Sequence, residues 1–107
     1  MLARDVAVLR KYYCIMVIEL VCNIDERQGR INLVTADKRL KDMFIASLRR
    51  IGIKGVHVYV NEDSKHDRNW RDKFVVRITG RERFEAILKN YPFSTDKRRM
   101  IARLVKG

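Results

Sequence analysis

The chain has 107 residues, with 24 Lys and Arg against 13 Asp and Glu, which leaves a formal net charge of +11. Its length predicts one domain over residues 1–107, and one Pro with five Gly excludes collagen-like, linker-like and disordered classes. The charge excess favours a polyanionic partner, because phosphate neutralisation releases counterions; a thermophile-type surface rich in Arg, Lys and Glu is the alternative interpretation.

The hydrophobic pattern predicts the elements in chain order. A run without Gly or Pro opens the chain as a helix, and the next segment alternates as a strand does. Asp37 is a candidate N-cap for a second, amphipathic helix that Gly52 ends, and Pro92 separates the last two helices, whose candidate caps are Thr79 and Ser94. The expected order is helix, strand, helix, strand, strand, helix and helix, over residues 3–23, 30–36, 37–52, 55–63, 73–79, 79–90 and from 94 onward.

The first predicted helix contains both cysteines, Cys14 and Cys22. At about 1.5 Å rise per residue their spacing separates them by roughly 12 Å, which is too far for a disulfide. The apolar run from Tyr12 to Cys22 is interrupted by Glu19 and is too short to cross a bilayer. The sequence therefore predicts a reduced, soluble, cytoplasmic protein with no membrane partner.

Alternation within the strands assigns side chains to two faces of a small antiparallel or mixed sheet, with helices on one face, which makes an α+β fold. The face toward the helices is expected to carry Ile31, Leu33, Thr35, Val56, Val58, Val60, Phe74, Val76 and Ile78. The opposite face is expected to carry Asn32, Val34, His57, Tyr59, Asn61, Lys73, Val75, Arg77 and Thr79.

Cationic and hydrogen-bonding side chains on this second face suit phosphates and base edges, whereas an ordinary solvated sheet face is the alternative. Tyr59 and the loop residue Trp70 are aromatic and suit stacking on unpaired bases, although a lone Trp more often closes over a core edge. The candidate nucleic-acid contacts are Arg30, Asn32, His57, Tyr59, Arg71, Lys73, Arg77 and Arg98.

Several segments carry a family resemblance: "GRINLVTADKRLKDMFIASLRRIGI", "GVHVYVNED", "KFVVRITGRERFEAILKNYPF" and "STDKRR". A strand ending Val-Thr leads into a basic helix that closes on Ile-Gly, and two further strands follow. Pro92 and Phe93 come next, with Lys97 four residues beyond Phe93. Over roughly residues 30–104 the chain resembles the back two-thirds of a LAGLIDADG homing endonuclease domain.

The resemblance implies a homodimer. In this family the first helix packs against its own sheet and against the same helix of a second domain. A helix that is apolar nearly all round suits two buried faces, and a helix enclosed within a monomer is the alternative. The expected dimer face is Cys14, Val17, Ile18, Val21 and Cys22, and the expected sheet-facing side is Tyr12, Ile15, Met16, Leu20 and Ile24.

The resemblance also implies a metal-dependent cleavage site at the paired helix ends. It assigns Asp25, with Glu26, as Mg²⁺ ligands that activate water, and Lys97 as a charge stabiliser near the scissile phosphate. Aligned without gaps on Gly29, the family's acid position falls instead on Gln28. An acidic turn and a solvated lysine are the non-catalytic alternatives.

Two departures from the family shape the functional prediction. The helix end lacks the Gly or Ala expected at a close crossing, and the interval before the second helix leaves room for one strand where the family has a long hairpin. We therefore predict a dimeric, double-stranded-DNA-binding protein with weak or lost cleavage, needing Mg²⁺ only if catalytic. The alternatives are an active Mg²⁺-dependent site-specific DNA endonuclease and a non-catalytic RNA- or DNA-binding regulator.

Overall fold

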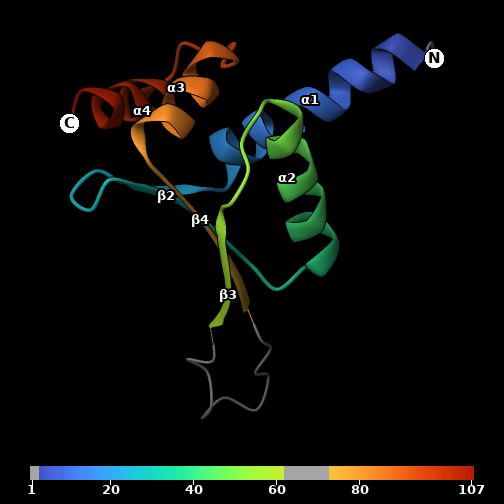
Figure 1. Ribbon diagram of the computed structural model, residues 1–107, viewed down its shortest axis with the longest axis horizontal. Helices are drawn as coiled ribbons and strands as arrows, with labels where there is room; N and C mark the ends of the chain where they lie inside the picture. Colours follow the sequence, from blue (N-terminus) through green and yellow to red (C-terminus); the bar gives the residue numbers. More distant parts are fainter. Residues whose placement is uncertain (1–2, 62–72) are drawn as a thin grey trace.

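The computed structural model describes the backbone of residues 3–61 and 73–107, and the side chains of residues 9–60 and 73–107. Within these ranges the chain is an α+β fold with four helices and one four-stranded antiparallel sheet (Figure 1). No helix of these ranges is long and apolar enough to cross a membrane. The elements are α1 Ala3–Leu20, β1 Asn23–Asp25, β2 Arg30–Thr35, α2 Lys38–Arg50, β3 His57–Asn61, β4 Lys73–Thr79, α3 Arg81–Lys89 and α4 Asp96–Lys106.

A short hairpin connects α1 to α2, so the expectation of a single strand in this interval was wrong. α1 ends at Leu20, and β1 pairs antiparallel with β2, with Asp25 opposite Arg30. Gly29 closes the turn with φ of 67°, and its N–H donates to the Asp25 carbonyl at 2.9 Å. A strand of three residues is too short to show an alternating pattern in the sequence. It forms because of the ladder hydrogen bonds that it shares with its neighbour.

The sheet has the strand order β1-β2-β4-β3, and every neighbouring pair is antiparallel. In β2 and β4, Ile31 lies opposite Ile78 and Leu33 opposite Val76, and all four side chains are fully buried, as the alternation predicts. The helices complete one hydrophobic core around them. Its other main members are Ile15, Ile18, Phe44, Leu48, Phe84, Ile87 and Ile101.

The helix caps match the sequence prediction only in part. The carboxylate of Asp37 caps α2 by accepting from the backbone N–H groups of Arg39 and Leu40 at 2.9 and 3.2 Å, which confirms the expected N-cap. The N-cap residues of α3 and α4 are Gly80 and Thr95, and neither makes a side-chain cap bond. The expected caps at Thr79 and Ser94 are therefore not formed.

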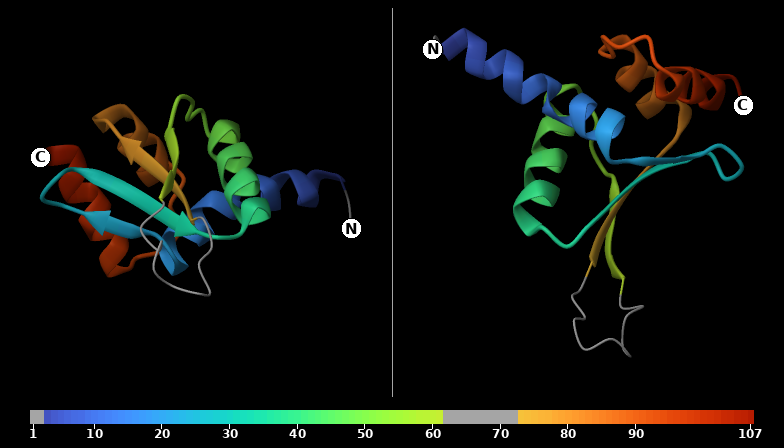
Figure 2. Two further views of the ribbon diagram at one scale, coloured as in Figure 1. Left: turned by 90° about the horizontal axis from the view of Figure 1, so that it is seen from below. Right: turned by 180° about the vertical axis from the view of Figure 1, so that it is seen from behind.

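The two-stranded ribbon of β3 and β4 extends beyond the N-terminal end of α2 (Figures 1 and 2). Val58 and Val60 were expected in the core, but they are 42% and 46% exposed, because β3 is an edge strand with a neighbouring strand on one side only. Val75 was expected outside, yet it is only 4% exposed. It lies between Val34 on β2 and Tyr59 on β3, and neighbours in register on both sides limit its contact with water.

Candidate nucleic-acid interface

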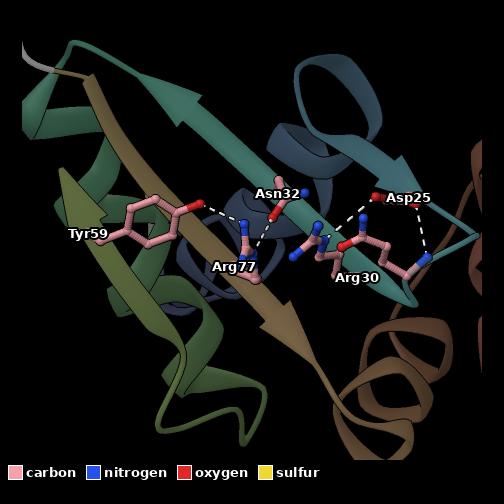
Figure 3. A network of polar contacts seen from close by, with 6 residues as sticks. Asp25, Arg30, Asn32, Tyr59 and Arg77 are labelled. Atoms are coloured by element: carbon pink, nitrogen blue, oxygen red, sulfur yellow. Dashed lines mark hydrogen bonds and ion pairs between the residues drawn. The ribbon is translucent and has the colours of Figure 1, made fainter. Parts of the chain in front are cut away.

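Arg77 lies at the centre of the sheet face that points away from the helices, between side chains of both neighbouring strands (Figure 3). Its Nε donates to Oδ1 of Asn32 on β2 at 3.2 Å, and its Nη2 donates to the Tyr59 hydroxyl on β3 at 2.6 Å. The guanidinium carbon also lies 5.2 Å from the centroid of the Tyr59 ring, within cation–π range. The guanidinium of Arg77 is thus oriented by contacts from two strands.

A second pair continues this row of polar side chains to the edge strand β1 (Figure 3). Nε of Arg30 lies 3.6 Å from Oδ2 of Asp25, and that Nε is buried without a hydrogen-bond partner. The other carboxylate oxygen of Asp25 accepts from the backbone N–H of Gln28 at 3.1 Å. Asp25 therefore stabilises the β1–β2 turn and lies beside a cation, in a strand and not at a helix end.

We define the open sheet face as Arg30, Asn32, His57, Tyr59, Lys73 and Arg77. All six were predicted as contacts, and Arg77, Tyr59 and Asn32 form one network with Arg30 adjacent to it. His57 is exposed opposite Arg77, and Lys73 is exposed at the start of β4. Arg98 is exposed on α4, which contacts β1 at the sheet edge, so it lies outside this network. Arg71 and Trp70 lie outside the described residues.

The two candidate metal ligands have separate cationic partners. Asp25 pairs with Arg30, whereas Oε1 of Glu26 lies 2.7 Å from Nε of Arg103 on α4. Over residues 3–61 and 73–107, no group of three or more His, Cys, Asp or Glu side chains is placed to hold a metal ion. Each of the two carboxylates is therefore paired with an arginine, with which a Mg²⁺ ion held by one or two carboxylates would compete.

Lys97 contacts the C-terminal end of α1. Its half-buried ammonium donates to the carbonyl oxygens of Ile18 at 3.1 Å and Cys22 at 2.8 Å. Burial raises the pKa of the Cys22 thiol to about 12, against the opposing effect of the Lys97 charge. The Lys97 ammonium therefore caps the C-terminal end of α1 and is not the fully solvated charge of the non-catalytic alternative.

A partly buried polar cluster that the sequence did not predict surrounds Glu19. Its carboxylate accepts hydrogen bonds from the hydroxyls of Tyr91 and of Thr95, the latter at 2.9 Å. Burial, and then the neighbouring Glu19, raise the pKa of the Tyr91 phenol. The isolated acid within an apolar run was the signal in the sequence, but its partners lie more than seventy positions along the chain.

The apolar surface of α1 is divided differently from the expectation. Cys14, Val17, Ile18 and Cys22 were expected to face a second copy, but all four are buried in the core of the protomer; Val21 alone of the expected face is exposed, at 54%. Met16 and Leu20 were assigned to the sheet, yet they are 49% and 73% exposed. Met16, Leu20 and Val21, which we call the α1 apolar patch, are the residues available to a partner at this end of α1.

Comparisons with known proteins do not identify a family for this chain. No protein-family model matches the chain, and searches of curated proteins and of solved structures find no match.

Proposed function

We propose that the chain binds double-stranded DNA through its open sheet face. The observation that carries the proposal is the arginine at the centre of that face. Arg has five N–H donors, and two of those of Arg77 are engaged by Asn32 and Tyr59. Because the side chain is already oriented, less conformational entropy is lost when the remaining donors bind a phosphate or the guanine edge.

The charge distribution supports the same function. The chain carries +11 overall, and the open sheet face holds Arg30, Lys73 and Arg77, of which Arg30 is paired with Asp25. His57, Tyr59 and Lys73 are exposed on this face, and the β3–β4 ribbon extends beyond the N-terminal end of α2 (Figure 1). A cationic surface of this kind binds nucleic acid by releasing condensed counterions.

The β1–β2 hairpin also supports the resemblance to LAGLIDADG homing endonucleases, because a hairpin occupies the expected interval, although β1 has only three residues where the family has a long hairpin. The other departure, the lack of a small residue at the end of α1, argues for a wide helix crossing. We propose that a second copy covers the α1 apolar patch, since a two-fold pair of patches buries Met16, Leu20 and Val21 in both protomers. Each such side chain contributes about 1.5–3 kcal/mol when fully buried.

Cleavage is proposed to be weak or absent. The carboxylate of Asp25 is paired with Arg30 and accepts from the Gln28 N–H, and Glu26 is paired with Arg103, so a bound cation would have to compete with these contacts. An active Mg²⁺-dependent endonuclease is the second candidate, favoured by the ammonium of Lys97 at the same end of α1 that leads into Asp25. A non-catalytic RNA-binding regulator differs from the main proposal only in its nucleic-acid preference.

The test of DNA binding is fluorescence anisotropy with a labelled duplex over a range of salt concentrations. Replacing Lys73 and Arg77 with Gln should weaken binding and reduce the slope of log affinity against log salt by about 0.9 for each phosphate that the variant no longer neutralises. A matched control replaces Arg49 and Lys89, which are exposed on α2 and α3, and should change the slope less. Undetectable binding at physiological salt, or equal effects of the two double variants, would contradict the proposal; tighter binding of RNA would favour the regulator.

A further inference from the structure

We propose that the groove between α1 and α2 is a docking site for an acidic, amphipathic segment of a protein partner. The groove has a volume of about 300 Å³ and is lined by Leu9, Arg10, Tyr13, Met43, Ala46 and Arg50, with Ser47 at its base. It lies among the helices, so a segment bound there leaves the open sheet face free. The inference is therefore independent of DNA binding.

The base of the groove is formed where Ser47 of α2 contacts the backbone of α1. The buried hydroxyl of Ser47 accepts from the Cys14 N–H at 2.8 Å and donates to the Arg10 carbonyl oxygen at 2.6 Å. In a regular helix the Cys14 N–H and the Arg10 carbonyl pair with each other, so the Ser47 hydroxyl contacts both partners of one backbone hydrogen bond. This contact holds the two helices together at one point, and α1 continues from there past α2 toward the N-terminus (Figures 1 and 2).

The floor of the groove is apolar and has no partner within the described part of the chain. Leu9 is 57% exposed and Met43 is 47% exposed, although both are large hydrophobic side chains. Tyr13 lines the same groove from the next turn of α1. A hydrophobic groove between two helices is the surface into which an amphipathic helix places apolar side chains at i, i+3 and i+4 spacing.

The rim determines the charge of the occupant. Arg10 and Arg50 are exposed at the groove, and among the described residues no acidic side chain lines it. A segment with Leu or Phe flanked by Glu or Asp complements both the floor and the rim. A second copy of this chain fits less well because the proposed dimer already places it on the α1 apolar patch, and nucleic acid fits less well because an apolar floor does not suit phosphates.

The probe for this site is a fluorescein-labelled peptide of about 12 residues, roughly three helical turns, with Leu and Phe at i, i+3 and i+4 spacing and Glu elsewhere. We expect it to bind the full-length wild type with a dissociation constant on the order of 10 µM by fluorescence anisotropy at physiological salt. The same peptide with Lys in place of every Glu should bind more weakly by about tenfold or more, because it meets Arg10 and Arg50 with like charge.

Two variants locate the binding. Ala46→Glu adds a carboxylate at an exposed helical position in the groove, where Glu forms helix nearly as well as Ala, and should weaken binding by about tenfold or more. Arg50→Gln removes a rim charge without filling the groove and should weaken binding by about threefold or more. Arg39→Gln, exposed on α2 outside the groove, removes the same unit of charge and should change binding by less than about twofold.

Several outcomes would overturn the proposal. It fails if the Glu and Lys peptides bind equally, or if Ala46→Glu and Arg50→Gln both bind like the Arg39→Gln control while circular dichroism shows them folded. Displacement of the peptide by a DNA duplex at physiological salt would make the groove part of a nucleic-acid site. A lower mass of Ala46→Glu than of wild type by light scattering would make it an interface between copies.

Discussion

The ammonium of Lys97 on α4 lies 2.8 Å from the carbonyl oxygen of Cys22, directly after the end of α1. The same ammonium donates to the Ile18 carbonyl at 3.1 Å, so one cation satisfies two acceptors at the negative end of the helix dipole. This contact links the last helix to the first across most of the chain. It also places the residue that the family resemblance assigns to cleavage in a structural role.

Lys97→Ala is expected to lower the free energy of unfolding by about 1.5–3 kcal/mol, the usual contribution of hydrogen bonds to a charged group. Two carbonyl groups at the end of α1 lose their donor in this variant. Urea denaturation followed by circular dichroism measures the change. The neighbouring Arg98→Ala removes an exposed charge from the same helix and should stay within about 0.5 kcal/mol of wild type; equal effects of the two changes would exclude the capping role.

Wild type is expected to be a dimer, with about twice the protomer mass of 12.7 kDa by light scattering at concentrations well above micromolar. Leu20→Lys should give a folded monomer, because Leu20 is 73% exposed and its replacement leaves the core unchanged. Val58→Lys, at an exposed valine on β3, should leave the mass unchanged. Val17→Lys should unfold the chain, since Val17 is only 6% exposed. A monomeric wild type would contradict the dimer.

Purified wild type should nick supercoiled plasmid slowly or not at all when Mg²⁺ is added. The reason is that the pair with Arg30 holds the Asp25 carboxylate away from the position that metal binding would require. Misplacement of a catalytic group by about 1 Å can lower the rate on the order of a hundredfold. If nicking is detected, Asp25→Asn should abolish it and Lys97→Ala should slow it, whereas the surface variant Lys89→Gln should not. Efficient, specific double-strand cutting would instead establish the active endonuclease.

The stability of the fold should decline in alkaline solution because of Tyr91. Its pKa is raised in the folded state above the ordinary value of 10.0 by burial and then by Glu19, so the protonated phenol is favoured on folding. That contribution is complete below pH 10 and is lost as the pH rises from 10 toward the folded-state pKa. Tyr91→Phe should therefore flatten the decline measured by urea denaturation between about pH 9 and about pH 11. A loss of stability in Tyr91→Phe that is equal at about pH 9 and about pH 11 would contradict this assignment.

Local patterns in the sequence determined the parts of the fold whose periodicity is clear. The alternation of β2 assigned Ile31 and Leu33 to the core, and the amphipathic pattern of α2 with Asp37 at its start placed that helix and its cap. These predictions succeed because a side chain's face follows from its position within one element. The same alternation placed Asn32, Tyr59 and Arg77 on one face of the sheet before their contacts were known.

The tertiary structure decided what no single element encodes. Tyr59, Arg77 and Asn32 meet because strands distant in sequence pair in one register, and β1 exists because β2 supplies its ladder bonds. From Tyr12 to Cys22 every position except Glu19 is apolar, so periodicity could not distinguish buried Val17 from exposed Leu20. Val58 and Val60 likewise have the alternation of core residues, but they lie on the edge strand β3, and which part of an edge strand is covered depends on the other elements of the fold.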